Sequence, residues 1–288
     1  MFKTTAPAKV NLSLSVGSPL PAQNMMHPLV SRMTTVDFCD ELSVTRLDEG
    51  DLSRYAVLWH EEAPRKSQIN WSITSDLAVR AHRHLEAETG HPLPVQMKLE
   101  KRIPVGAGLG GGSSDAAAML RATASLFDLD VNLLTIAAAL GSDIPFLLEG
   151  GTKLVSGLGE IIEPDDPANT PLVLILPPYG CPTGEVYDAF DGLPSAEMNS
   201  ERVSRGDIFN DLTAAAMEVS ETLSSDMEQV ASIAENDVHL SGSGSTMFVI
   251  CDTAMLAEDL ATTIEEKTGL VAIATHTTVP TMELEKTE

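Results

Sequence analysis

A glycine-rich segment, Val105–Asp115, carries the clearest chemical signal in the sequence. Five glycines occupy the seven positions from 106 to 112, and glycine accepts positive φ angles that let a backbone curl around a ligand. Two serines, an aspartate and three alanines follow, a pattern typical of a helix start. The N–H groups of such a loop and the positive end of the helix dipole attract anions. We therefore predict that a phosphate group binds here, against Val105, Gly106, Ala107, Gly108, Leu109, Gly110, Gly111, Gly112, Ser113, Ser114 and Asp115.

Three other interpretations of this segment are weaker. A plain turn would not need so many glycines directly before a helix. Three of the glycines match the dinucleotide fingerprint G-x-G-x-x-G, which expects an acidic residue on a second strand about 20 residues later. Asp128 and Asp130 fall instead between two predicted helices. A Walker A loop needs a lysine after its last glycine, and Ser113 stands in that place.

Two side chains outside the segment could support chemistry on a phosphate. Asp143 follows a turn at Gly141, where a carboxylate can enter a cleft and accept a proton; its ordinary role there is a helix cap or Asx turn. Lys9 lies in a stretch that alternates polar and apolar residues, where a lysine is ordinarily solvated. Lys101 and Arg102 flank the glycines and either relieve the local negative field or face solvent.

The elements that position these residues are a mixture of strands and helices, which indicates the α+β class. A proline-rich acidic stretch from Glu163 to Pro171 predicts a boundary, so that the chain divides into domains 1–163 and 171–288. Strands are predicted over Lys9–Val16, Val30–Val36, Glu41–Thr45, Val95–Leu99, Leu172–Leu176, Met247–Cys251 and Leu270–Thr275, and helices over Ile73–Thr89, Asp115–Phe127, Leu133–Leu140, Asp211–Glu235 and Met255–Lys267.

The composition limits the partners of the chain. Its 288 residues carry 18 basic and 42 acidic side chains, a net charge of −24 that repels nucleic acid and anionic membranes. A phosphate site must therefore depend on local donors and cations. Three widely spaced cysteines show no metal-ligand spacing and suit a reducing compartment. The first residues lack an apolar signal segment, and we expect a cytoplasmic protein.

Several segments, in order along the chain, resemble the motifs of the GHMP kinases, which include galactokinase and homoserine, mevalonate and phosphomevalonate kinases. Val105–Ser114 resembles the second motif, and its extra glycines with the following Asp-Ala-Ala are most similar to members acting on 4-diphosphocytidyl-2-C-methyl-D-erythritol. Ala6–Leu12 resembles the first motif, Leu240–Thr246 the third, and Gly141–Phe146 the catalytic aspartate segment. Weaker similarities occur at Gly184–Asp188 and Asn210–Leu212.

The resemblance implies a two-domain GHMP kinase fold, with a left-handed βαβ unit in the N-terminal domain and a ferredoxin-like C-terminal domain. It implies ATP-dependent phosphorylation of the 2-hydroxyl of 4-diphosphocytidyl-2-C-methyl-D-erythritol, in the non-mevalonate pathway to isoprenoid precursors, with Mg²⁺ as the metal. Asp143 would accept the hydroxyl proton, and Lys9 would contact its carboxylate. The expected partner is this small molecule, bound by a monomer or a homodimer.

The resemblance also implies which residues bind the acceptor: Asn11, His27, Gly242, Ser243 and Gly244. Strand packing explains Asn11 equally well. In the family, a loop that reads approximately Asp-Gly-Tyr-His supplies the cytosine contacts, and the corresponding stretch here is Asn24–His27. The histidine is kept, whereas Met25 and Met26 replace the glycine and the tyrosine. Two alternatives follow, another GHMP kinase of the homoserine or mevalonate type and a catalytically silent nucleotide-binding relative.

Overall fold

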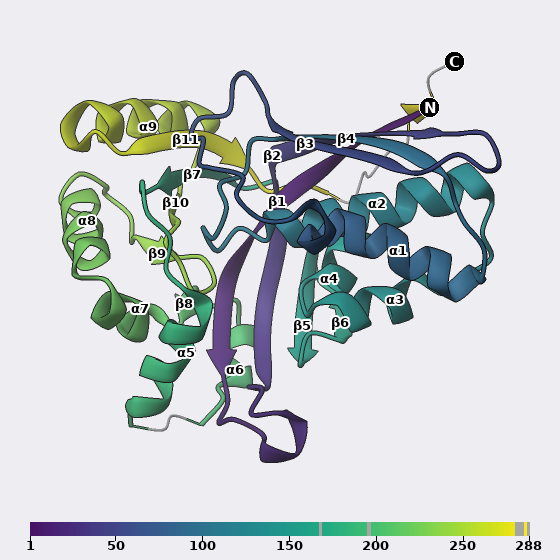
Figure 1. Cartoon of the computed structure of the whole chain (residues 1–288). Coiled ribbons are helices and arrows are strands. Elements are labelled where there is room, and N and C mark those ends of the chain that lie inside the picture. The colour runs from purple at the N-terminus through teal and green to yellow at the C-terminus, as the bar shows by residue number, and fades with distance from the viewer. Residues whose placement is uncertain (167–168, 195–196, 280–284, 287–288) are drawn as a thin grey trace.

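The computed structural model describes residues 1–166, 169–194, 197–279 and 285–286, whose strands form two sheets (Figure 1). The first sheet has the order β12-β1-β2-β4-β3, with β5 and β8 attached to β2 and β1, and β6 attached to β5. Its strands in the described residues are β1 (Phe2–Val16), β2 (Leu29–Arg46), β3 (Arg54–Trp59), β4 (Val95–Lys101), β5 (Thr152–Gly157), β6 (Ile161–Pro164), β8 (Phe209–Asn210) and β12 (Glu285–Lys286).

Helices pack on this sheet and supply its hydrophobic core. The 3-10 turn Ile73–Ser75 leads into α1, and Asp76 caps α1 by accepting the N–H of Ala78. Strands β3 and β4 pair in parallel with α1 between them in the chain, which makes a βαβ unit. The helices of this half are α1 (Leu77–Thr89), α2 (Gly111–Phe127), α3 (Leu133–Leu140) and α4 (Ile144–Glu149).

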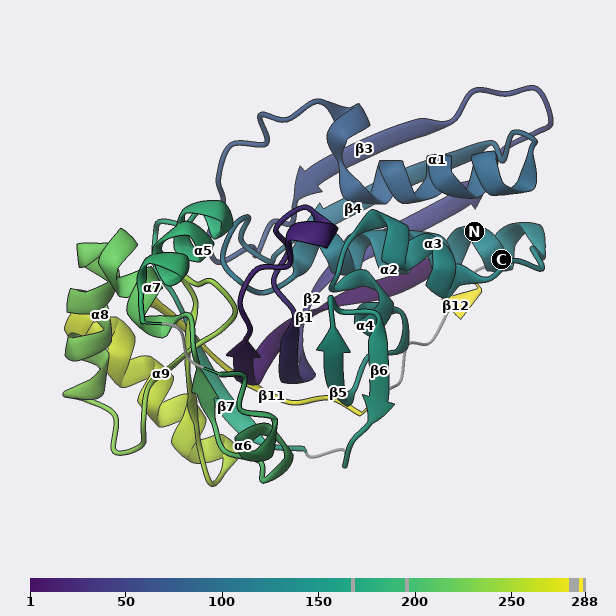
Figure 2. The same cartoon turned by 90° about the horizontal axis from the view of Figure 1, so that it is seen from below.

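The second sheet is antiparallel, with the order β11-β7-β10-β9. Its strands are β7 (Pro171–Leu176), β9 (His239–Leu240), β10 (Met247–Ile250) and β11 (Val271–His276). Figure 2 shows this sheet and α7 to α9 at one end of the molecule, and α1 to α3 at the other. The helices of this half are α5 (Thr183–Gly192), α6 (Ser200–Ser204), α7 (Thr213–Val219), α8 (Glu221–Ala231) and α9 (Ala254–Thr268).

Strand β7 joins the two halves because both of its faces are buried. Val173 and Ile175 pack in the core that includes α8 and α9, whereas Leu172 and Leu174 pack in a core shared with β1 and β2. The side chains of a strand alternate between its faces, so a strand buried on both faces must be apolar throughout. The continuous apolar run in the sequence follows from this position.

The C-terminal half also returns to the first sheet. Strand β8 pairs in parallel with β1, and β12 pairs with the other end of β1. The division into domains 1–163 and 171–288 stays a prediction, since strands from the second range complete the first sheet. Within the described ranges, no helix has the length and apolar character needed to cross a membrane.

Several predicted elements differ from the observed ones. The helix predicted over Asp211–Glu235 is wrong, because Ser220 is extended at φ −134° and its side chain caps α8 by accepting the N–H of Leu223. The two strands predicted within residues 30–45 are one continuous strand, β2. Helix α2 begins at Gly111, four residues before the predicted start at Asp115. Strand β3 lies in a mixed, charged stretch that the pattern left unassigned.

Candidate active site

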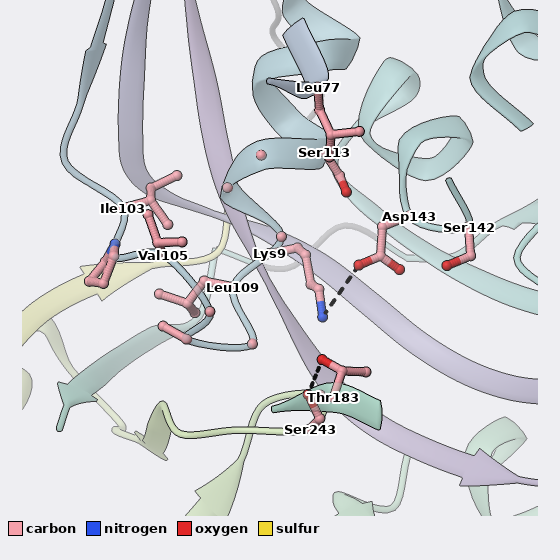
Figure 3. A pocket seen from close by; sticks show the side chains of 18 of the residues that line it. Lys9, Leu77, Ile103, Val105, Leu109, Ser113, Ser142, Asp143, Thr183 and Ser243 are labelled. Carbon is pink, nitrogen blue, oxygen red and sulfur yellow. Dashed lines mark hydrogen bonds and ion pairs between the residues drawn. The ribbon is translucent and has the colours of Figure 1, made fainter. Parts of the chain in front are cut away.

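A cavity of about 560 Å³ opens where β1, α5 and two glycine loops meet. We name Pro104–Gly110 the first glycine loop and Ser241–Thr246 the second glycine loop. Figure 3 shows Lys9 and Asp143 facing one another in this cavity, with Ser113 close by on the side of α2 and with Thr183 and Ser243 opposite. Polar side chains that line it are Lys9, Asn11, Ser75, Asp76, Lys101, Ser113, Asp115, Ser142, Asp143, Thr183, Tyr187 and Ser243.

The first glycine loop holds its curvature through residues with positive φ. Gly106, Gly108 and Gly110 have φ angles of +69°, +77° and +67°, which side-chain-bearing residues adopt only with strain. Gly110 is the N-cap residue of α2 and has no side chain with which to cap it. The first N–H groups of α2 therefore stay available to a ligand, and the dipole of α2 adds positive potential there. This geometry suits an anion such as a phosphate.

The two glycine loops pack directly against each other. The Ser241 hydroxyl donates to the carbonyl oxygen of Gly108 at 3.0 Å, and the N–H of Thr246 donates to the carbonyl oxygen of Ala107 at 3.1 Å. A Cβ atom at Gly108 would lie far inside contact distance of the carbonyl oxygen of Ser241. Glycine at this position is thus required both by φ and by the approach of the second loop.

A buried lysine and an aspartate form the polar centre of the cavity. The Lys9 ammonium lies 3.8 Å from Oδ2 of Asp143 and donates to Oδ1 of Asn11 at 2.6 Å. The Asn11 amide in turn donates to the Ser31 hydroxyl at 2.8 Å, so Asn11 orients Lys9. Burial lowers the pKa of Lys9, and the charge of Asp143 opposes that shift. Lys9 is therefore not a solvated edge residue, and its charge is directed at Asp143.

Asp143 occupies the N-cap position of α4, but its side chain accepts no capping hydrogen bond. The carboxylate is consequently free to face the cavity, and 27% of its side chain is exposed. The opposite end of α4 is fixed by Arg121 of α2, which donates to the carbonyl oxygen of Leu147 at 2.9 Å. Helix α4 and the helix that follows the first glycine loop are thus held together.

The opposite wall of the cavity comes from α5 and the second glycine loop. The hydroxyls of Thr183 and Ser243 are hydrogen-bonded at 3.0 Å. The ring of Tyr187 lies 4.8 Å from that of His27 between centroids, and His27 Nε2 lies 2.9 Å from Oδ1 of Asp191. Burial and the nearby charge of Asp143 raise the pKa of Tyr187 to about 12, so its hydroxyl keeps its proton at neutral pH.

The structure brings most of the predicted site residues to this cavity. His27, Ser114 and Gly244 do not line it: Ser114 is buried in α2, and His27 contacts the cavity only through Tyr187. The carboxylate of Asp115 binds the ammonium of Lys101. Those that line the cavity are Lys9, Asn11, Val105, Gly106, Ala107, Gly108, Leu109, Gly110, Gly111, Gly112, Ser113, Asp115, Asp143, Gly242 and Ser243.

Sequence reasoning missed part of the lining. Tyr187 belongs to the segment Gly184–Asp188, which resembles the family only weakly, and its aromatic side chain was the one local signal, whereas Thr183 directly precedes that segment. Trp71 and Asp76, which precede α1, also line the cavity, and the Trp71 indole donates to Oδ2 of Asp76 at 3.1 Å. No pattern in the surrounding sequence marks these two residues, because they reach the cavity through the packing of α1 on α2.

Two glycine loops against a helix start, with a lysine–aspartate pair between them, define a small-molecule kinase of the GHMP class. Residues 76–151 match the family model described as the GHMP kinases N terminal domain. The crystal structure of homoserine kinase from Cytophaga hutchinsonii superposes with a TM-score of 0.66 at 16% identity, covering 96% of this chain and 94% of that one. That likeness confirms the predicted fold.

Relatives with higher identity narrow the class to one enzyme. The 4-diphosphocytidyl-2-C-methyl-D-erythritol kinase of Polaromonas naphthalenivorans is 34% identical over 269 residues, which cover 89% of this chain and 88% of that protein. A crystal structure of 4-(cytidine 5'-diphospho)-2C-methyl-D-erythritol kinase superposes with a TM-score of 0.77 at 30% identity and covers 96% of this chain and 98% of that one. The chain belongs to the 4-diphosphocytidyl-2-C-methyl-D-erythritol kinase family, and the predicted kinase class is confirmed.

Proposed function

We propose that this chain transfers the γ-phosphoryl group of ATP to the 2-hydroxyl of 4-diphosphocytidyl-2-C-methyl-D-erythritol. The products are ADP and the 2-phosphate, an intermediate of the non-mevalonate isoprenoid pathway. The observation that carries the proposal is the Lys9–Asp143 pair, 3.8 Å apart and facing the first glycine loop, in a chain of this family. Phosphoryl transfer needs this combination of an anion cradle and a base for the acceptor hydroxyl.

In the proposed mechanism, Asp143 accepts the proton of the acceptor hydroxyl. The hydroxyl oxygen forms its bond to the γ-phosphorus as the bond from that phosphorus to the bridging oxygen of ADP breaks. The ammonium of Lys9 keeps Asp143 ionised before the transfer and offsets the negative charge that develops nearby. Asn11 fixes the direction of the ammonium through its 2.6 Å hydrogen bond.

The nucleotide phosphates would lie against residues 105–113, where the first glycine loop and the start of α2 present N–H groups. Magnesium fits the donors present, since it prefers oxygen ligands and is commonly held by one or two side chains together with phosphates. Ser113 and Asp143 project toward the same part of the cavity and are the residues that would hold it (Figure 3). When bound, the ion would neutralise phosphate charge.

The acceptor would lie on the side of the second glycine loop and α5. Gly242 and Ser243 line this wall, and His27 with Tyr187 forms an aromatic pair that a nucleobase can contact. In this proposal the range 1–163 binds the nucleotide, and the range 171–288 together with His27 contributes the acceptor wall. The acceptor is the partner of a cytoplasmic monomer or homodimer, and the net charge of −24 argues against nucleic acid.

A coupled ADP-release assay with three acceptors tests the proposal. We expect turnover with 4-diphosphocytidyl-2-C-methyl-D-erythritol and none with homoserine or mevalonate. Turnover with homoserine or mevalonate alone would favour the second candidate, another GHMP kinase. The observation that favours this candidate is the loop at Met25 and Met26, whose side chains are non-aromatic and 55% and 47% exposed. A protein that binds ADP but phosphorylates none of the three would be a silent relative.

A further inference from the structure

Three buried charged side chains lie at the base of the first glycine loop. The ammonium of Lys101, at the end of β4, lies 2.6 Å from Oδ2 of Asp40 and 2.5 Å from Oδ2 of Asp115. The exposed fractions of Lys101, Asp40 and Asp115 are 4%, 0% and 2%. The roles proposed above for the base, its lysine and the phosphate donors leave this cluster without a task.

The cluster joins the two ends of the loop. Asp40, on β2, accepts through Oδ1 the main-chain N–H groups of Arg102 and Ile103, the residues that lead into the loop. Asp115 lies in α2, the helix that leaves the loop. Lys101 therefore bonds on one side to a group that fixes the incoming chain and on the other side to the outgoing helix.

The closeness of the two ends is visible in the packing as well. A Cβ atom at Gly111, the first residue of α2, would lie 2.8 Å from Cγ2 of Ile103. Residues 103 and 111 thus touch across the base of the loop. The three glycines with positive φ between them gain much conformational freedom if this base opens, so a closed base limits the shapes that the loop adopts.

Stability alone does not explain the cluster. Taking charges out of water is costly, and a buried ion triplet is commonly no more stable than apolar side chains of the same volume. Burial disfavours the charge of Lys101, but the two carboxylates outweigh burial and raise its pKa, so the lysine keeps its proton. Asp40 and Asp115 set two carboxyl groups against one ammonium, and burial with the neighbouring Asp40 raises the pKa of Asp115 well above its usual range despite the charge of Lys101, so the arrangement is costly beneath a phosphate site.

We propose that Lys101 and Asp115 are positioning residues that hold the first glycine loop in its phosphate-binding shape by tying its two ends together. The inference rests on the proposed function, since it assumes a nucleotide phosphate in that loop. A loop that is already closed loses less entropy when the ligand binds, and this raises affinity. The acceptor wall, which lies on the other side of the cavity, gains nothing from it.

Two substitutions at position 115 separate the effect of the hydrogen bond from Lys101 from the effect of the carboxylate charge. Asp115→Ala and Asp115→Asn both remove the negative charge and both leave the buried Lys101–Asp40 pair balanced. The asparagine amide oxygen can still accept the hydrogen bond from Lys101, whereas alanine cannot, and alanine does not weaken the helix. Asp37→Asn, at an exposed position of β2, is the control for the loss of one acidic charge.

The affinity for ADP is measured by isothermal titration calorimetry, with the melting temperature of the free protein and the acceptor KM measured on the same variants. We expect Asp115→Ala to raise the Kd for ADP about tenfold, equivalent to about 1.4 kcal/mol, and Asp115→Asn to raise it about twofold. Asp37→Asn should leave the Kd unchanged, and the acceptor KM should stay within about twofold in every variant.

Equal weakening by alanine and asparagine would overturn the inference, because the charge and not the tie would then matter. It is also overturned if the alanine variant binds ADP as tightly as the parent, or if its acceptor KM and melting temperature deteriorate together with the Kd. A parent protein that binds no ADP would overturn the proposed function along with this inference. A parent that binds ADP and an unaffected alanine variant would overturn this inference alone.

Discussion

Replacing Asp143 with asparagine tests the catalytic centre most directly. Asparagine has nearly the shape of aspartate, but it has no negative charge and cannot act as the base. Asp143 caps no helix N–H through its side chain, so the substitution removes no capping bond from α4. Its structural cost is limited to the pairing with Lys9, whose ammonium lies 3.8 Å from the carboxylate.

Two effects determine how far Asp143→Asn should lower kcat and change the pKa of Lys9. A positioned general base contributes about 10²- to 10⁴-fold to a rate, and kcat should fall by that factor. Two unit charges about 4 Å apart attract each other by about 4 kcal/mol at an effective dielectric constant of about 20. This is an upper limit for the Lys9–Asp143 pair, since 27% of the Asp143 side chain is exposed to solvent. Without that attraction, burial of Lys9 is opposed only by its bond to Asn11, and its pKa should fall further.

The assay follows ADP release at saturating ATP and acceptor, with ADP affinity measured separately. Because one negative charge leaves the pocket, we expect the variant to bind metal-free ADP as tightly as the parent or more tightly. Asp130→Asn, at an exposed position between α2 and α3, is the control for charge and should keep the parental kcat. A kcat within tenfold of the parent in Asp143→Asn would refute the assignment of the base.

Three further predictions follow from the site. As the pH rises, the rate should decline below 10.5, the ordinary pKa of a lysine, because burial lowers the pKa of Lys9 and its neutral amine no longer supports the base. A kcat–pH profile that is flat up to that value would contradict this. His27→Leu should raise the acceptor KM about tenfold and leave ADP affinity unchanged, because it removes the ring packed 4.8 Å from Tyr187. Gly108→Ala should weaken ADP binding at least about tenfold more than Gly106→Ala, measured by calorimetry. Both glycines have positive φ, but only position 108 meets the second glycine loop, so equal losses would count against the contact between the loops.

The part of the site that the sequence predicts is the part built from local signals. The glycines with positive φ, the helix start after them and the aspartate beyond Gly141 are all visible within short windows. Lys9 required the family resemblance, because its burial depends on Gly110 and Gly242, whose missing side chains leave room for it. Alternation of polar and apolar residues alone would have placed its ammonium in water.

The part that could not be predicted depends on contacts between distant residues. Asp40 meets Lys101 across 61 positions of the chain, and nothing near either residue indicates the pairing. Helix α7 ends at Val219 because the backbone at Ser220 is extended, although the apolar pattern continues past it. Strand β3 forms because β4 offers it a parallel edge, and a short strand with exposed alternate residues has little local signature.

Because the chain is strongly acidic, the proposed binding of phosphate depends on main-chain N–H groups. The charged side chains that line the cavity are Lys9, Asp76, Lys101, Asp115 and Asp143, three acids against two bases within the described residues. One of the two lysines is already bound by two carboxylates. Attraction for a nucleotide phosphate therefore cannot come from a net positive lining. In the proposed function it comes from N–H groups of the first glycine loop and of the start of α2, with the help of a divalent ion, and the N–H groups require that the loop keep its shape. In a chain of net charge −24, the fixed shape of the first glycine loop has the role that basic side chains have in other phosphate sites.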